Sequence, residues 1–106
     1  MAYDRLRDAL TRGNLWLYIL AALEEGPATP VELKSFVGSR HGFEPATITF
    51  YSVLYKLRRE GLVRKSSSAY RSTYEITHRG TQEMARGREL LRSTEQGLTR
   101  RGPGTP

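Results

Sequence analysis

The sequence contains no cysteine among its 106 residues, and it has only two histidines and one tryptophan. The absence of cysteine excludes disulfide bridges and cysteine-ligated zinc. His41 and His78 are far apart and have no cluster of ligands beside them, so we expect no metal site. Long apolar runs are also missing. The longest, residues 15–23, is shorter than the roughly 18 residues of a membrane span.

Catalytic and targeting motifs are absent as well. No histidine belongs to a recognisable nucleophile motif, and no glycine loop has the spacing that binds phosphate. Charged residues between positions 4 and 8 precede any apolar run, which is unlike a signal peptide. We therefore expect a single-domain protein that is not an enzyme, carries no cofactor, binds no membrane and is cytoplasmic by default.

Acidic residues are outnumbered, with 17 lysines and arginines against 11 aspartates and glutamates and a net charge of +6. A basic balance favours polyanionic partners such as nucleic acid or an anionic membrane surface. The cations are also unevenly distributed, because residues 56–71 contain a single acid, Glu60. The cations of that segment are Lys56, Arg58, Arg59, Arg64, Lys65 and Arg71.

Apolar periodicity predicts five helices. A short amphipathic helix is expected over residues 3–10, and a core helix over residues 14–25. A third helix is capped by Thr29, begins at Pro30 and ends before a polar turn between Gly38 and Gly42. The fourth begins near residue 45 or 47 and stops at residue 60, and the last covers about residues 79–98.

The fourth helix has two different faces. Phe50, Leu54 and Leu57 recur at the spacing of one buried stripe. The opposite face carries hydroxyl and cationic side chains, which suits insertion into a DNA groove. These side chains are Thr49, Ser52, Tyr55, Lys56 and Arg59.

Beyond Gly61 the pattern changes to that of a β-hairpin. Residues 62–65 and 70–77 are predicted strands joined by a polar turn over residues 66–69, and Tyr70, Ser72, Tyr74 and Ile76 share one face. Three helices followed by a hairpin form a winged helix-turn-helix, so the fold class is mainly α with a small β-hairpin (α+β). In that fold the third helix of the motif contacts the bases and the hairpin, or wing, contacts the flanking backbone.

The last helix carries Met84, Leu91 and Leu98 at intervals of seven residues. This seam is of the coiled-coil kind and is too narrow for the core of a monomer, which predicts a dimer interface. We expect one domain over residues 1–98, with a dimerisation helix at about 78–98 and a flexible tail at 99–106. The predicted dimerisation residues are Leu6, Leu10, Trp16, Met84, Leu91 and Leu98.

The chain resembles the PadR-type transcriptional regulators over roughly residues 12–92. The matching segments are residues 20–27, 49–51 with Leu54 and Leu57, 60–63, and 74–77 followed by Gly80. The resemblance implies a dimeric DNA-binding regulator, usually a repressor, whose C-terminal helix forms the dimer interface. In some small relatives a tryptophan at that interface touches planar ligands, so a small aromatic effector is a possible partner.

The chain departs from the family pattern on or near the fourth helix. Thr47 and Ile48 stand where a proline–glycine pair is typical, Ser52 replaces a usual proline, and Arg58 replaces a usual acid. The DNA sequence that this chain recognises therefore cannot be inferred from the DNA sites of the family.

The candidate DNA-binding residues lie on the fourth helix and the wing. Thr47, Thr49 and Ser52 occupy the first turns, where a recognition helix approaches bases or phosphates most closely. Tyr51 either reaches a phosphate or packs at the flank of the core, and both interpretations stay open. The others are expected at the DNA backbone: Tyr55, Lys56, Arg59, Arg64, Lys65 and Arg71.

Three functions fit these patterns. The favoured one is a homodimeric regulator of transcription that binds a pseudo-palindromic site on double-stranded DNA. A protein that coats DNA with little sequence preference is the second, and a winged-helix module that binds other proteins is the third. For Arg64 and Lys65 the alternative is an ordinary solvated strand edge.

Overall fold

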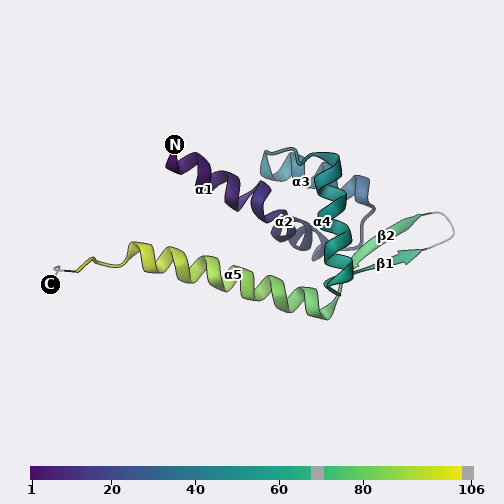
Figure 1. Ribbon diagram of the computed structural model, residues 1–106. Coiled ribbons are helices and arrows are strands. Elements are labelled where there is room, and N and C mark those ends of the chain that lie inside the picture. Colours follow the sequence, from purple (N-terminus) through teal and green to yellow (C-terminus); the bar gives the residue numbers. More distant parts are fainter. Residues whose placement is uncertain (68–70, 104–106) are drawn as a thin grey trace.

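The computed structural model describes residues 1–67 and 71–103 and shows a mainly helical chain with one two-stranded antiparallel hairpin (Figure 1). The predicted fold class is confirmed. In chain order the elements are α1 (Ala2–Leu10), the 3₁₀-helix η1 (Arg12–Asn14), α2 (Leu15–Leu23), α3 (Pro30–His41), α4 (Thr47–Arg59), β1 (Val63–Ser67), β2 (Ser72–Ile76) and α5 (His78–Thr99).

Helix α2 is the centre of the core, as its broad apolar face predicts. Ile19 and Leu20 are fully buried, and α3, α4 and α5 all pack around this helix. Phe50 of α4 and Val37 of α3 are also fully buried against it. Packing against three neighbours explains why a helix of nine residues without charges is stable here.

Helix α3 is longer than the sequence predicts. Thr29 and Glu32 form a capping box at its start, which confirms the predicted N-terminus. The helix then continues through Gly38 to His41 and ends at Gly42, which has a φ of +72°. The expected turn between Gly38 and Gly42 is therefore wrong. A Cβ on Gly38 would lie 2.9 Å from the carboxylate of Glu44, an exposed side chain that can move aside.

The hairpin pairs Val63 with Ile76 at its base and Ser67 with Ser72 at its outer end. Strand β1 therefore extends through residues 66 and 67, which the sequence assigns to the turn, while residues 68–70 lie outside the described part. Tyr74 also exchanges two backbone hydrogen bonds with Ala28, at 2.8 and 3.1 Å. This bridge ties the wing to the loop between α2 and α3, so the wing has a fixed base.

Helix α5 starts tightly against the hairpin. Thr77 caps its first turn by accepting from the Gly80 N–H at 3.1 Å, and the Thr77 hydroxyl donates to the Gly61 carbonyl at 2.6 Å. A Cβ on Gly80 would lie 2.2 Å from the Leu62 carbonyl oxygen, so only glycine permits this approach. Further along, Gly87 packs on Trp16 of α2. Of the predicted tail, 99–106, Thr99 ends α5 and residues 104–106 lie outside the described part.

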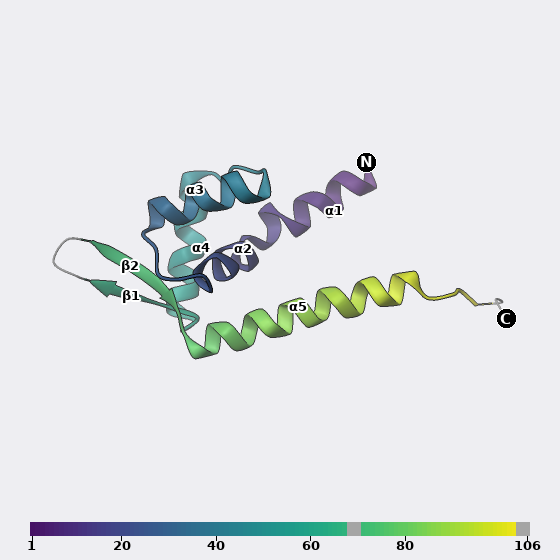
Figure 2. The same ribbon diagram turned by 180° about the vertical axis from the view of Figure 1, so that it is seen from behind.

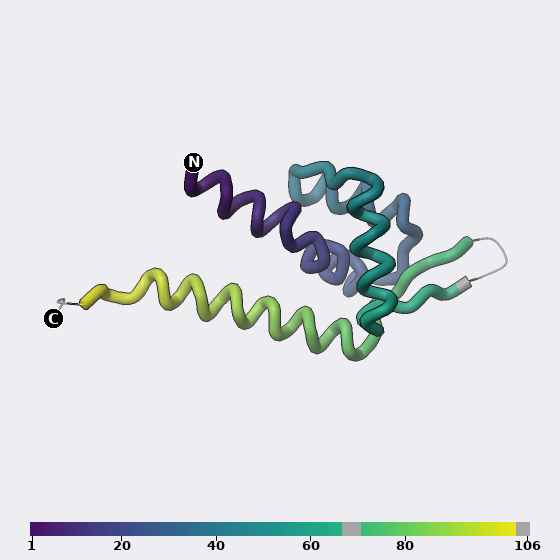
Figure 3. The backbone as a smooth tube through the Cα atoms, in the orientation of Figure 1, coloured from purple at the N-terminus to yellow at the C-terminus, as the bar shows by residue number. Residues whose placement is uncertain are grey.

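The second half of α5 leaves the rest of the molecule, and every residue from 88 to 103 is exposed. Both ribbon views show α1 and this half of α5 projecting on the side opposite the hairpin (Figures 1 and 2). The Cα trace makes the elongation plain (Figure 3), with extents of 65 × 30 × 21 Å. The radius of gyration is 16.3 Å, against about 13 Å for a compact domain of this length.

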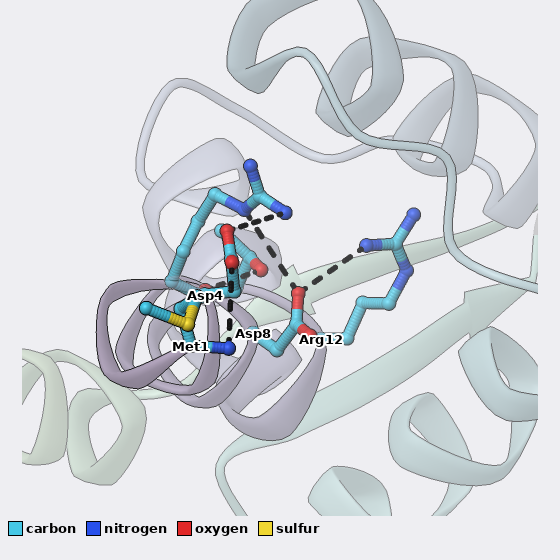
Figure 4. Close-up of polar contacts among 6 residues, drawn as sticks. Met1, Asp4, Asp8 and Arg12 are labelled. Carbon is cyan, nitrogen blue, oxygen red and sulfur yellow. Dashed lines mark hydrogen bonds and ion pairs between the residues drawn. The ribbon is translucent and has the colours of Figure 1, made fainter.

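Helix α1 buries none of its residues. Its polar side is held by exposed ion pairs, among them the Met1 ammonium with Asp4 at 3.8 Å and Arg12 with Asp8 at 4.0 Å (Figure 4). Exposed pairs of this kind stabilise a helix by only a few tenths of a kcal/mol, about 0.3–0.5 each. Its apolar side chains, Tyr3, Leu6 and Leu10, are exposed.

Candidate nucleic-acid interface

Helix α4 separates its two faces as the sequence predicts. Phe50, Leu54 and Leu57 are buried at 3% exposure or less and fix the helix on the core. Successive residues turn by about 100°, so the opposite side points away from the core. The side chains predicted to contact DNA from this helix are all exposed: Thr47, Thr49, Tyr51, Ser52, Tyr55, Lys56 and Arg59.

Tyr51 lies at the flank of the buried stripe, and its ring meets the Phe50 ring edge-on at 5.9 Å between centroids. The side chain nevertheless remains 43% exposed. Both of the interpretations given for it, packing and reaching outward through the hydroxyl, are therefore compatible with its position.

The N-terminus of α4 has a different chemistry from those of α3 and α5. Its cap residue is Ala46, which offers no side-chain acceptor, and its first turn, like that of α5, contains no acid. In α3 and α5 the corresponding amides donate to Thr29 and Thr77. The first amides of α4 therefore keep their hydrogen-bonding capacity, and the helix dipole makes this end attractive to anions.

The cations of α4 carry no compensating carboxylate. Among residues 1–67 and 71–103, no ion pair involves Lys56, Arg58 or Arg59. The Arg59 guanidinium instead stacks over the Tyr55 ring, 5.7 Å from its centroid. That contact orients both side chains on the outward face of the helix. The exposed face of α4 therefore presents positive charge that no acid of the described residues pairs with.

The wing arginines are placed differently from those of α4. Arg64 forms an ion pair with Glu75, the residue directly opposite it across the hairpin. Arg71 forms one with Glu32 at the start of α3. Lys65 is exposed on β1 and makes no ion pair within the described residues. The wing is thus less cationic than its sequence alone indicates.

Glu32 has two structural roles at the junction of α3 and the wing. Its carboxylate accepts the Thr29 N–H at 2.9 Å and also binds Arg71. The hydrogen bond from the Thr29 backbone, followed by that from Arg71, lowers the pKa of Glu32 below its ordinary value. The carboxylate therefore stays charged, and it holds the guanidinium of Arg71 toward α3.

Trp16 stands between two surface cavities of about 550 and 560 Å³. The first lies between the start of α2, the inner edge of α4 and the start of α5, and Lys56 and Arg79 contribute to its wall. The second lies along α5 beside Gly87 and Leu90. No group of acids, histidines or cysteines in the described part of the chain is suited to hold a metal ion. The described helices include none that is long and apolar enough to cross a membrane.

The six predicted dimerisation residues do not form one uniform set. Leu6, Leu10, Leu91 and Leu98 are exposed, whereas Met84 is 5% exposed and belongs to the core of the winged-helix domain. The expectation that the whole seam lies outside the subunit core is therefore wrong for Met84, because α2 covers the first turns of α5. Trp16 is partly buried against Gly87 of the same subunit.

The arrangement of α3, α4 and the hairpin is shared with known regulators. A transcriptional regulator from Clostridium thermocellum is 22% identical, with a TM-score of 0.75 and coverage of 82% of this chain and 88% of that one. A PadR-family transcriptional regulator from Eggerthella lenta is 24% identical, with a TM-score of 0.72 and coverage of 92% and 93%. A winged-helix DNA-binding protein from STIV has a TM-score of 0.66 at 15% identity, covering 76% and 89%. At these identities the likeness shows the fold.

Sequence comparison gives the family. No curated protein matches the chain. The model of the PadR-like family of transcriptional regulators matches residues 19–86, which include α3, α4 and the wing. This family consists of transcription regulators and not of enzymes, in agreement with the expectation from the motifs. The match covers more than half of the sequence, and the chain belongs to the PadR-like family of transcriptional regulators.

Proposed function

We propose that the protein is a repressor that binds a pseudo-palindromic DNA site as a homodimer, with α4 in the major groove and the wing on the flanking backbone. The observation that carries the proposal is the outward face of α4. There, hydroxyl groups, two tyrosines and cations without carboxylate partners lie on one side of a rigidly packed helix. Hydroxyl and cationic side chains form hydrogen bonds with base edges and phosphates.

The first turn of α4 is the part that would approach the bases. Thr47 and Thr49 place short hydroxyl side chains there, Ser52 follows in the second turn, and the first turn contains no acid to oppose the approach of phosphate. Lys56 and Arg59 follow one and two turns later, where a helix lying in the groove diverges toward the sugar–phosphate backbone. The order along the helix thus supports base contacts first and backbone contacts after them.

The wing would contribute contacts with the backbone beside the groove. Lys65 supplies an exposed charge, while Arg64 and Arg71 would exchange a carboxylate for a phosphate on binding. Exposed ion pairs are worth only about 0–1 kcal/mol, so such an exchange costs little. We expect smaller contributions from these two arginines than from Lys56.

Dimerisation is supported by the apolar side chains that one subunit leaves uncovered. Leu90, Leu91 and Leu98 are exposed on the projecting half of α5, and Leu6 and Leu10 are exposed on α1. A nine-residue helix without buried residues is unstable in isolation, so α1 needs a partner. Pairing with the α1 and α5 of a second copy would cover both sets about one two-fold axis.

A two-fold dimer places its two α4 helices in successive major grooves, about 34–36 Å apart along the duplex. The site would then consist of two inverted half-sites separated by one helical turn. Repression follows from occupancy, because a protein that fills both grooves of a promoter excludes the transcription machinery.

A small aromatic effector would enter beside Trp16. The cavity in front of this side chain is shared by α2, α4 and α5, so a bound molecule would touch both the DNA-reading helix and the helix that joins the subunits. That arrangement supports coupling between effector binding and the position of α4.

Electrophoretic mobility shifts distinguish the proposed repressor from a DNA-coating protein. With DNA from upstream of the protein's own gene and an excess of competitor, we expect one sharply saturating complex. A ladder of complexes that grows with DNA length would instead identify a coating protein. The absence of any shift at low salt would contradict DNA binding altogether.

The dependence of affinity on salt tests the assignment of cations to phosphates. Each phosphate contact contributes about 0.9 to the slope of log K against log salt concentration, so Lys56→Ala should flatten the slope by about that amount in each subunit. Arg64→Ala should flatten it less, because Glu75 already neutralises that side chain. Arg92→Ala on the projecting half of α5 is the matched control and should leave the slope unchanged. Equal slopes for all four proteins would contradict the assignment.

A further inference from the structure

Ile48 is the most exposed large hydrophobic residue in the described part of the chain apart from the N-terminal methionine. Its side chain is 83% exposed, although it belongs to a helix that is firmly packed on the core. Single exposed hydrophobic residues are common on protein surfaces, so exposure alone indicates no function. The position of Ile48 is the informative feature.

Ile48 lies in the first turn of α4, between the hydroxyl side chains of Thr47 and Thr49. At about 100° per residue it points almost directly away from Phe50 and the buried stripe. The same rotation aligns it with Ser52, Tyr55 and Arg59, four, seven and eleven residues later. Ile48 is therefore the apolar first member of the outward row that would face the floor of the groove.

The fold gives no reason for an isoleucine at this position. The side chain contributes nothing to the core, and isoleucine has a lower helix propensity than alanine. An apolar group at this point is thus a property of this chain that neither the helix nor the core requires.

We propose that Ile48 selects thymine by packing against its 5-methyl group in the major groove, at one position in each half-site. This inference rests on the proposed function, since it requires α4 to lie in that groove. The thymine methyl is the only apolar group that the four bases present on their major-groove edge. An aliphatic side chain among hydroxyl groups contacts it favourably, whereas at any other base it would lose that contact and would desolvate polar edge atoms instead.

The test removes the methyl group and nothing else. DNA sites selected by the protein from a random pool are resynthesised with each thymine in turn replaced by uracil, which keeps the same hydrogen-bonding edge. At one thymine per half-site we expect the substitution to weaken binding about fourfold, the equivalent of exposing one buried methyl group. At the other thymines that the protein contacts only through polar atoms, affinity should not change.

Protein variants then assign the effect to Ile48. Ile48→Ala, which changes both subunits of the dimer, should bind the thymine site about as weakly as the wild-type protein binds a site with uracil in both half-sites, and uracil should cause no further loss in this variant. Ile48→Val, which keeps a branched apolar group, should retain most of the discrimination. Val31→Ala is the matched control, because Val31 is a similarly exposed aliphatic residue (72%) on α3, and it should respond to uracil as the wild-type protein does.

The possible failures are distinguishable. If the protein selects no site from the pool and shifts no DNA at low salt, the proposed function is wrong and this inference falls with it. If it binds selected sites but uracil weakens binding at no thymine, or weakens it equally in the wild-type protein and in Ile48→Ala, only the role of Ile48 is overturned. Because Ile48 and Val31 are exposed, the thermal unfolding midpoint should not fall in any of the three variants.

Discussion

The molecule has two regions that differ in the burial of their apolar side chains. They are the winged-helix body, residues 11–87, and the projecting segment, residues 88–99 of α5. In the body, α2 is enclosed by α3, α4 and α5, and its central residues are fully buried. In the projecting segment every residue is exposed, with Leu98 82% exposed. One heptad row runs through both: Met84 is buried within the body, while Leu91 and Leu98 continue beyond it. A single sequence pattern is therefore buried within the chain at one end and left exposed at the other.

A methyl group added to α5 distinguishes the two regions most strongly. In the body, Gly80→Ala places a Cβ about where the Leu62 carbonyl oxygen already lies, at 2.2 Å, so the hairpin and α5 must separate. We expect a loss of about 3 kcal/mol in the free energy of unfolding. Urea denaturation followed by circular dichroism measures it.

The matched control is Gly97→Ala in the projecting segment, where no atom lies within 4 Å of the added Cβ. Alanine has the higher helix propensity, so this variant should be unchanged or more stable by less than about 1 kcal/mol. Similar losses for both variants would show that the projecting segment is as closely packed as the body.

A charge on the heptad row tests whether the projecting segment joins two subunits. Leu91→Arg should produce a monomer in sedimentation equilibrium, because a guanidinium would have to enter an apolar interface. Loss of the link between two half-sites should weaken binding to a full DNA site about a hundredfold. Because Leu91 is 44% exposed and is not a member of the buried core, each subunit should keep its fold.

Gln96→Arg introduces the same charge about 140° around the helix from Leu91 and should remain dimeric. A dimeric Leu91→Arg protein would show that the leucines of the projecting segment are not the interface.

Local periodicity was sufficient to predict the body. The spacing of Phe50, Leu54 and Leu57 defined the buried side of α4, and Thr29 defined the start of α3. The end of α3 was missed because glycine is a typical helix stop, whereas here Gly38 is helical and the chain turns only at Gly42. The buried part of the heptad row is the part that α2 covers. The packing of α2 on α5 is a tertiary contact, which local periodicity does not contain.

The same limit applies to the candidate interface. The exposed face of α4 followed from the sequence, but the charge of the wing did not. Glu75 lies opposite Arg64 only once the hairpin register is fixed. Counting residues back from the turn along both strands could have predicted this pair. Glu32 reaches Arg71 across 39 positions, and no local pattern contains that contact.

The ion pair between Arg88 and Glu24 gives the smallest expected effect and concerns the boundary between the two regions. Arg88 is the first residue of the projecting segment, and its guanidinium binds both carboxylate oxygens of Glu24 at the end of α2, one of them at 3.1 Å. The hydrogen bonds with Glu24 raise the pKa of Arg88, so the pair stays charged. Arg88→Ala should lower the free energy of unfolding by about 0.5–1 kcal/mol, since the pair is partly exposed but bidentate.

Arg92→Ala removes an arginine four residues later whose partner, Glu89, is on the same helix, and should cost only about 0.3 kcal/mol. The change in helix propensity is the same in both variants, so the difference between them isolates the contact with α2. A double-mutant cycle with Glu24→Ala should return a coupling of the same sign and size for Arg88 and none for Arg92. If the two arginines proved equal, the ion pair with Glu24 would add nothing to the packing of Gly80, Met84 and Gly87 that holds α5 on the body.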